Sequence, residues 1–310
     1  MKINHIKGVD ISAVSLGTVQ LGMNYGINNA NGKPDQATAF KILDAAMDSG
    51  MNALDTAAGY GDSEIVIGHW LKQRTSGTMP FVMTKARKLD HTSFETLRES
   101  LYSQVMESKE RLGLSQLPLL MLHNCEDYLT DKENIKLLFD QLKAEGHIRF
   151  SGISAYSHHD YGEIAASGFD AVQIPINIFD WGQIENGGLQ KLHESGMMIF
   201  VRSVYLQGLV FQDPDKLSEQ MSFCKDTLIK FRALCNKYKL SPAALALSYA
   251  LSLPGVTSLV LGSETVAQVE DNVQLLAQTV DLSKQQMAEI RENFLNTDPH
   301  VLNPGTWPNR

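Results

Sequence analysis

The chain has 310 residues, of which 43% are hydrophobic, and a formal net charge of −8. This length and apolar content allow one large core, and α/β barrels often reach this size as one domain, so we expect a single domain over residues 1–310. The acidic balance and the scattered Lys and Arg residues exclude a basic face for nucleic acid, and no apolar run approaches the length of a membrane-spanning helix.

The cysteines and histidines give no clear metal signal. The three cysteines, Cys125, Cys224 and Cys235, form neither a C-x-x-C pair nor a metal-binding spacing. Their odd number, and an N-terminal segment without the pattern of a signal peptide, indicate the reducing cytoplasm. His158 and His159 are the one tempting pair of ligands, but adjacent loop residues diverge, so we expect solvated side chains and no metal.

The predicted elements begin with two short strands between Ile3 and Val14, arranged around Gly8-Val9-Asp10 as a hairpin that plugs one end of the fold. Apolar strands and amphipathic helices then alternate along the chain. Strands are expected at 14–18, 52–55, 81–85, 119–123, 149–154, 171–175, 198–202 and 258–262. Helices are expected at 36–49, 63–72, 92–112, 131–145, 161–167, 187–195, 241–253 and 265–276, with capping boxes at Thr92-x-x-Glu95 and Thr265-x-x-Gln268.

This alternation predicts the fold class. Strands that are apolar without alternation are typical of a parallel sheet buried on both faces, and eight strand–helix units in one chain predict a (β/α)8 TIM barrel. The barrel carries an N-terminal β-hairpin, a long insertion at 203–240 after strand 7, and a C-terminal extension from Leu282. Both additions are candidates to cover the barrel mouth, although the tail is equally compatible with a poorly ordered terminus. The alternative, an open doubly wound sheet, lacks its usual G-x-G-x-x-G turn.

Polar side chains stand at the ends of four consecutive strands. The first of these strands ends at Asp55, and Tyr60 lies in the loop that follows it. The next three strands end at Lys85, His123 and Ser154. Each has a structural explanation of its own, as a loop cap, a packed ring, a solvated lysine or a hydrogen-bonded core histidine. Because the carboxyl ends of barrel strands converge on one face, we instead expect these groups to form one site.

Together these residue types suit proton transfer to a carbonyl oxygen. A free tyrosine has a pKa of about 10, and a nearby ammonium favours the phenolate and lowers that pKa. Asp55 would hold Lys85 in place and charged, and His123 would hydrogen-bond the substrate oxygen. No side chain can deliver hydride, so a nicotinamide cofactor has to supply it.

Six motifs lie along the chain at strand ends and in the loops that follow them. They are Leu54-Asp55-Thr-Ala-x-x-Tyr60-Gly-x-Ser63-Glu64, Thr84-Lys85, Leu122-His123, Gly152-Ile-Ser154, Val172-Gln173 and Gly262-Ser263 through Asp271-Asn272. With these motifs the chain resembles the aldo-keto reductase family over nearly all of its length. The resemblance implies an NAD(P)-dependent oxidoreductase in which Asp55, Tyr60, Lys85 and His123 are the catalytic tetrad and Tyr60 is the general acid. It also implies a cofactor bound on the barrel without a Rossmann turn. The implied cofactor-binding residues are Gly17, Thr18, Ser154, Gln173, Arg202, Ser203, Gly262, Ser263, Glu264, Gln268 and Asn272.

The sequence departs from the family pattern in three places. Ala155 stands where an asparagine is frequent, and Arg202 stands where an aromatic residue usually stacks on the nicotinamide. At the adenosine end the chain has Gly262, Glu264 and Gln268 in place of basic groups, and the capping box gives Gln268 another task. Because a 2′-phosphate needs a cationic partner, we expect NAD(H) to be favoured over NADP(H).

The leading interpretation is an enzyme that interconverts a carbonyl and an alcohol on a small polar substrate such as a sugar, a polyol, an aldehyde or a ketone. One alternative is a cofactor-sensing or regulatory subunit of the same fold that performs no turnover. Another is a barrel isomerase or lyase acting on sugar phosphates, which needs a phosphate site near the last two strands. The sequence leaves the oligomeric state open.

Overall fold

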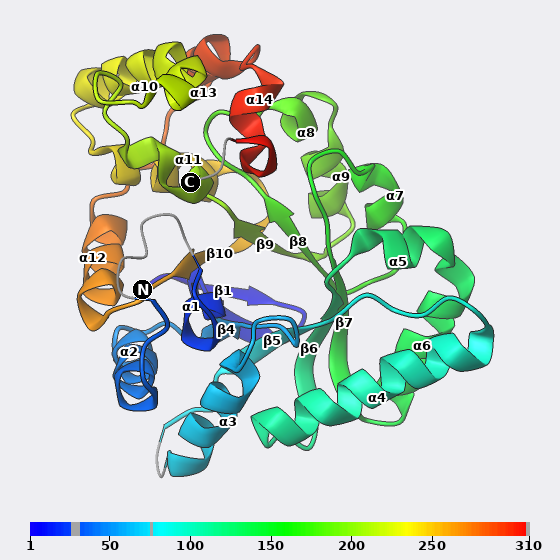
Figure 1. The fold of residues 1–310 in the computed structure, drawn as a ribbon. Coiled ribbons are helices and arrows are strands. Elements are labelled where there is room, and N and C mark those ends of the chain that lie inside the picture. Colours follow the sequence, from blue (N-terminus) through cyan, green and yellow to red (C-terminus); the bar gives the residue numbers. More distant parts are fainter. Residues whose placement is uncertain (26–31, 75–76, 308–310) are drawn as a thin grey trace.

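The computed structural model describes residues 1–25, 32–74 and 77–307. Eight parallel strands close into a barrel in the order β10-β3-β4-β5-β6-β7-β8-β9, which confirms the predicted (β/α)8 fold (Figure 1). In the register of this barrel, Gly17 lies opposite both Asp55 and Gly262. The strands are β3 (Val14–Gly17), β4 (Ala53–Asp55), β5 (Phe81–Ala86), β6 (Leu117–Leu122), β7 (Ile148–Ser154), β8 (Ala171–Pro175), β9 (Met198–Arg202) and β10 (Val256–Gly262).

Helices follow the strands and pack outside the barrel, where the large apolar core lies between the two layers. The eight predicted helices are α2 (Gln36–Asp48), α3 (Ser63–Gln73), α4 (Phe94–Leu112), α6 (Lys132–Ala144), α7 (Tyr161–Ala165), α9 (Gly188–Glu194), α11 (Pro242–Ser252) and α12 (Val266–Ala277). Three short helices within loops were not expected from the sequence: α1 (Val19–Gly22), α5 (Cys125–Thr130) and α8 (Gly182–Glu185). No helix in the described part of the chain is long and apolar enough to cross a membrane.

The caps of α4 and α12 differ in detail from the two capping boxes predicted from the sequence. The cap of α4 lies one residue later than predicted, at Ser93, because Thr92 bonds to Asp90 and Ser93 accepts the amide hydrogen of Thr96 instead. At α12, Thr265 caps as predicted by accepting from the amide of Gln268. The Gln268 side chain, however, returns to the amide of Glu264 rather than to that of Thr265, at 2.6 Å.

The N-terminal hairpin closes the amino end of the barrel as predicted. Strands β1 (Ile3–Ile6) and β2 (Val9–Ser12) pair antiparallel, and the turn lies at Lys7-Gly8, whereas Val9 and Asp10 of the expected turn belong to β2. Both turn residues have positive φ, 49° and 73°, which matches the twist of a two-residue hairpin loop. Ile11 packs among the side chains that fill the barrel interior, such as Met83 and Phe200.

The insertion and the C-terminal extension pack against each other. The insertion forms η1 (Leu206–Phe211), η2 (Glu219–Cys224) and α10 (Lys225–Tyr238), and the extension forms α13 (Lys284–Phe294), α14 (Pro299–Leu302) and η3 (Pro304–Thr306). The ring of Phe223 stacks on His300 with a centroid distance of 3.9 Å, and the indole of Trp307 donates to the His300 carbonyl. In Figure 1, α10, α13 and α14 lie together at the top of the view. The described tail is therefore a packed element.

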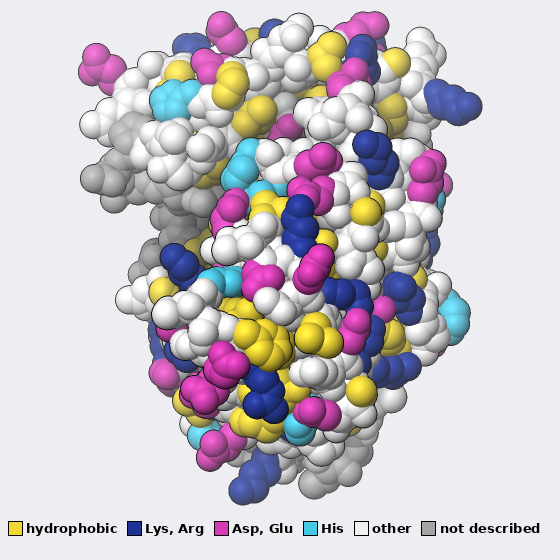
Figure 2. Space-filling model, turned by 90° about the vertical axis from the view of Figure 1, so that its right-hand side faces the viewer, with side chains coloured by type: hydrophobic (Ala, Val, Ile, Leu, Met, Phe, Trp, Pro, Cys, Tyr) yellow, Lys and Arg dark blue, Asp and Glu magenta, His cyan; other side chains and the backbone are white. Residues whose placement is uncertain are grey.

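The charged side chains are mixed on the face that Figure 2 shows. Acidic and basic groups alternate over the helices there, and neither sign forms a continuous region on that face. Ion pairs within or between helices of the structure include Lys136 with Asp140 in α6 and Lys132 with Glu163. The face shown therefore presents charges of both signs.

Candidate functional site

One cavity of about 750 Å³ brings together most of the residues expected at the site. This volume is in the usual range for a cofactor or ligand pocket. Lys85 lies fully buried beside this cavity rather than on its surface. The predicted residues on its wall are Gly17, Thr18, Asp55, Tyr60, His123, Ser154, Gln173, Arg202, Ser203, Gly262 and Glu264.

Lys85 is the centre of the tetrad. Its ammonium donates to the Asp55 carboxylate at 2.7 Å, to the Thr56 carbonyl at 2.9 Å and to the Tyr60 hydroxyl at 3.4 Å. Burial alone would lower the pKa of Lys85, but the charge of Asp55 and the contact with Tyr60 raise it above its ordinary value. Lys85 therefore stays cationic inside the barrel, as expected from the sequence.

Tyr60 differs from the expectation in one respect. The Lys85 ammonium does lower the pKa of Tyr60, but burial raises it by more, and the net pKa lies above its ordinary value of 10.0. The prediction of a lowered pKa named the right neighbour and omitted the larger effect of desolvation. At neutral pH Tyr60 is thus a protonated hydroxyl held at the barrel mouth, which is the state that a proton donor needs.

His123 completes the group from the end of β6. Its ring meets that of Tyr60 edge-on, with centroids 5.5 Å apart. Burial lowers the pKa of His123 to about 4, and the cations Lys85 and Arg202 contribute to this shift. The imidazole is therefore neutral near pH 7 and can donate one hydrogen bond without adding charge.

Buried hydroxyl groups and two glycines fix the loop that carries Tyr60. Thr18 donates to the Asp55 carbonyl at 2.8 Å, and Ser63 donates to the Thr18 carbonyl at 2.9 Å. The backbone of this loop runs so close to α1 that a Cβ at Gly22 would lie 1.8 Å from the Tyr60 carbonyl oxygen. Gly61 has φ +55°, and a Cβ there would lie 2.4 Å from the carbonyl of Gly22. The sequence analysis did not identify this role of Gly22 and Gly61.

The remaining predicted cofactor residues fall into two groups. Gln173 lines the cavity, and its amide also donates to Asp55 at 2.7 Å, which gives the carboxylate a second partner. Ser203 lines it with a strained φ of 64°. Ser263 and Asn272 instead bond to each other at 3.2 Å, and like Gln268 they are not on the wall formed by the described residues.

The cavity has features that fit a nicotinamide dinucleotide. Gly17 and Gly262 line its wall without side chains, and Gly262 has no room for one, because a Cβ there would lie 2.5 Å from the Gln20 side-chain amide. The polar side chains of Ser154, Gln173 and Ser203 line the same cavity as Tyr60. They could hydrogen-bond the carboxamide and the ribose hydroxyls of a nicotinamide cofactor. The start of the insertion adds wall residues that the sequence did not single out: Val204, Tyr205, Gln207, Gly208 and Phe211.

Arg202 occupies the end of β9 on the same wall. Its guanidinium lies over the ring of Tyr156, 4.6 Å from the centroid, and donates to the Ala155 carbonyl at 3.3 Å. It makes a second, longer contact of 3.5 Å with the Ser203 hydroxyl. The guanidinium thus stacks on a ring of the protein itself, that of Tyr156.

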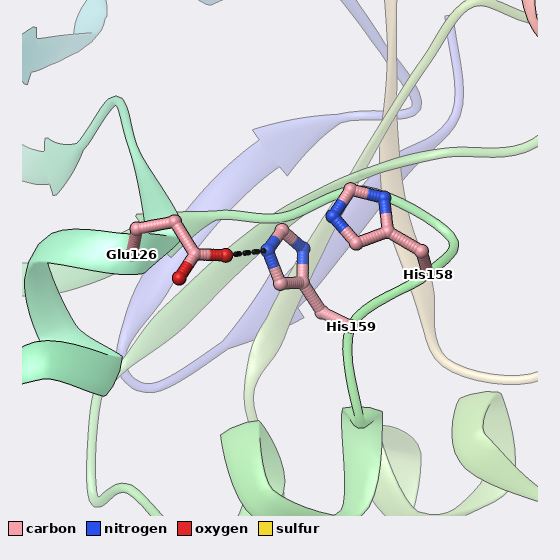
Figure 3. A group of neighbouring side chains, drawn as sticks. All are labelled: Glu126, His158 and His159. Carbon is pink, nitrogen blue, oxygen red and sulfur yellow. Dashed lines mark hydrogen bonds and ion pairs between the residues drawn. The ribbon is translucent and has the colours of Figure 1, made fainter.

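His158 and His159 do not diverge, which corrects the sequence prediction. Their rings lie 4.1 Å apart, and Glu126 of α5 approaches His159 from the other side (Figure 3). His159 is buried, and both of its ring nitrogens have partners: Nδ1 accepts the amide hydrogen of Tyr156 at 2.9 Å, and Nε2 faces Glu126 at 3.2 Å. A metal at Nε2 would require the proton to move to Nδ1, where it would meet the Tyr156 N–H. The three groups therefore fit a loop clamp better than a metal centre.

Comparisons with known proteins agree with this geometry. A family model described as "Aldo/keto reductase family" matches residues 13–293. The chain is 29% identical over 285 residues to the uncharacterized oxidoreductase YqkF of Bacillus subtilis, covering 86% of this chain and 87% of that protein. It is 25% identical over 321 residues to the NADH-specific methylglyoxal reductase of Escherichia coli, covering 92% and 95%.

A solved structure shares the same fold. The holo form of the aldo-keto reductase AKR11C1 from Bacillus halodurans superposes with a TM-score of 0.74 at 24% identity, covering 95% of this chain and 96% of that one. The family model spans most of the sequence and includes every strand of the barrel. The chain belongs to the aldo/keto reductase family of NAD(P)-dependent oxidoreductases.

Proposed function

We propose that this protein reduces the carbonyl group of a small polar substrate with NADH, and oxidises the corresponding alcohol in reverse, with Tyr60 as the general acid and base. The observation that carries the proposal is the position of Lys85, whose ammonium contacts both the Asp55 carboxylate and the Tyr60 hydroxyl. A buried ammonium beside a phenol has a clear use in proton transfer, because it stabilises the phenolate that forms.

Each member of the tetrad has one task in this mechanism. The reduced nicotinamide, when bound, supplies the hydride for the carbonyl carbon. Tyr60 donates its proton to the carbonyl oxygen, and Lys85 stabilises the resulting phenolate. Neutral His123 donates a hydrogen bond to the same oxygen and orients it, while Asp55 keeps Lys85 charged and in place. The buried hydroxyl groups of Thr18 and Ser63 keep the loop rigid.

Support for NADH comes from the adenosine end of the cavity. Glu264 lines the wall there, and Arg202, at the end of β9, is the single cation among the described wall residues. A carboxylate repels a 2′-phosphate but accepts hydrogen bonds from ribose hydroxyls. The Escherichia coli relative is named as NADH-specific, which agrees with this preference. A reducing cytoplasmic setting is part of the proposal, supported by three buried, unpaired cysteines.

The test is oxidation of NADH, followed by absorbance, with a panel of methylglyoxal, glyceraldehyde, aldoses and aromatic aldehydes. We expect turnover of at least one carbonyl compound, and a lower rate with NADPH at the same concentration. Binding of NADH measured by fluorescence quenching runs in parallel. Tight binding without turnover of any carbonyl compound would contradict the proposal and favour a cofactor-sensing protein.

A further inference from the structure

Arg202 stands in the cavity without a counter-charge. It forms no ion pair with a carboxylate of the described residues, and its two hydrogen bonds, to the Ala155 carbonyl and the Ser203 hydroxyl, are long at 3.3 and 3.5 Å. A guanidinium carries five N–H donors. Most of its hydrogen-bonding capacity is therefore available to a group that enters the cavity.

The guanidinium is nevertheless held in one place. The face of Tyr156 lies 4.6 Å from it, and the Tyr156 amide is in turn fixed by His159. This clamp limits the side-chain entropy that Arg202 would lose on binding a ligand. An arginine fixed by stacking and left without an acid is typical of a recognition group rather than of a structural ion pair.

The charge of Arg202 reaches the reacting groups. Its field favours the ionised form of Tyr60 and disfavours the protonated form of His123, so it acts on the same end of the cavity as both. Lys85 and Asp55 neutralise each other at 2.7 Å, and His123 is uncharged near neutral pH. Arg202 therefore leaves this end of the cavity with a net positive charge.

We propose that the substrate is a carbonyl compound that carries a carboxylate, and that Arg202 is the residue that binds this carboxylate. The inference rests on the proposed carbonyl–alcohol activity of the same cavity. A carboxylate matches the planar donor fork of one guanidinium. A phosphate dianion would call for a second cation, and the described wall residues offer none. The substrate class is accordingly an oxo acid, an aldehyde acid or a sugar acid.

The experiment compares 4-carboxybenzaldehyde with 4-nitrobenzaldehyde, which differ in charge and little in shape. The measured quantity is the ratio of their kcat/KM values with NADH, in the wild type, Arg202→Gln and Arg202→Lys. A charge-assisted contact in a partly exposed site is worth roughly 5- to 30-fold. We expect the carboxylate-to-nitro ratio to fall by about that factor in Arg202→Gln and by much less in Arg202→Lys, which keeps the charge. The ratio cancels any general loss of rate.

A second measurement uses the wild type alone. Raising the salt concentration should lower kcat/KM for the carboxylate and leave that for the nitro compound nearly constant, because screening acts on the charged pair. An unchanged ratio in Arg202→Gln, or no salt dependence, would overturn the proposal. Equal losses for both aldehydes together with weaker NADH binding would also overturn it, since Arg202 would then bind a cofactor phosphate.

The two proposals fail in different ways. If the wild type reduces neither aldehyde nor any other compound of the carbonyl panel, the proposed activity is wrong. The anion site is then judged by calorimetric binding of 4-(hydroxymethyl)benzoate against 4-nitrobenzyl alcohol, with and without NADH. A preference for the carboxylate that disappears in Arg202→Gln supports the site, and equal binding of the two alcohols rejects it.

Discussion

The ends of β5 and β9 each bring a cation to the cavity, but Lys85 and Arg202 are placed in opposite ways. Lys85 is fully buried and paired with Asp55, whereas Arg202 is partly buried and stacked on Tyr156. A buried charge must be compensated within the protein, so Lys85 is committed to its neighbours. A charge at the wall needs no such partner, and it remains available for a ligand. The contrast fits our two proposals, in which Lys85 supports proton transfer by Tyr60 and Arg202 binds the substrate.

The largest expected effect is on Tyr60, the group that Lys85 serves. General acid catalysis contributes typically about 10²–10⁴-fold, so we expect Tyr60→Phe to lower kcat for carbonyl reduction by that factor. NADH affinity should stay close to that of the wild type, because the hydroxyl acts on the substrate oxygen. Steady-state kinetics and a fluorescence titration check both points. A loss of only a few fold would remove Tyr60 from the role of acid.

Replacing Lys85 and Arg202 separately tests whether the paired cation contributes more to the stability of the fold than the unpaired one. Lys85→Met leaves the Asp55 carboxylate buried, with the Gln173 amide as its remaining side-chain partner among the described residues, and breaking a buried pair costs about 3–5 kcal/mol. Arg202→Met removes no ion pair, and we expect a change of at most about 1 kcal/mol.

Urea unfolding of both variants measures the difference. The double variant Lys85→Met/Asp55→Asn serves as the control, since removing both charges should recover part of the lost stability. If Lys85→Met and Arg202→Met lowered the free energy of unfolding by the same amount, the two cations would contribute equally to stability. That result would contradict the contrast between them.

The next largest effect is the pH dependence of stability that comes from His123, whose pKa is lowered by burial and by both Lys85 and Arg202. In the folded protein its pKa is about 4, below the ordinary value of 6.5, so the unfolded chain binds more protons between these values. Stability from this group is fully present above pH 6.5 and is lost as the pH falls towards 4. At about 1.36 kcal/mol per pKa unit, this shift from 6.5 to about 4 lowers the free energy of unfolding by roughly 3 kcal/mol.

Unfolding free energies measured between pH 7 and pH 4 check this prediction, with His123→Gln as the matched control. We expect the slope with pH to be smaller in the variant than in the wild type, since the other carboxylates titrate in both. Parallel curves for the two proteins would mean that His123 titrates normally in the folded state.

The smallest effect concerns Glu264, the acid at the other end of the cavity. A like-charge contact with a 2′-phosphate is worth roughly 1–2 kcal/mol at an effective dielectric of about 20 with salt screening. That corresponds to about 5- to 30-fold in affinity. We expect the wild type to bind NADH more tightly than NADPH, Glu264→Gln to narrow the preference and Glu264→Arg to narrow it further or reverse it. Fluorescence titration of both cofactors decides the matter, and tighter NADPH binding by the wild type would reject our interpretation of Glu264.

Much of the fold was predictable because it follows from local pattern. Strands buried on both faces must be apolar throughout, and the eight strand–helix units are visible in sequence for that reason. The convergence of Asp55, Tyr60, Lys85 and His123 also followed, since all strand ends of a parallel barrel point to one face. The short helices α1, α5 and α8 were missed because a single turn carries too little periodicity to detect.

Other features depend on neighbours that are distant in sequence. The sequence indicated that Lys85 acts on Tyr60, but only the folded barrel shows that burial outweighs the ammonium in setting the pKa of that phenol. Gly22 and Gly61 are needed because two loops, joined to different strands, pass within contact distance. The pairing of His159 with Glu126 likewise required both loops to be in place.

The sequence by itself therefore determined the barrel, the residues of the tetrad and the position of Arg202, because strand ends and motif spacing are local properties. The sequence also led us to expect Asp55 beside Lys85, but only the tertiary structure decided how deeply each cation is buried and which partners Arg202 has. It placed Lys85 against Asp55 and left Arg202 with Tyr156 and no carboxylate among the described residues. Desolvation and charge compensation depend on the whole set of surrounding atoms, and no stretch of sequence contains that set.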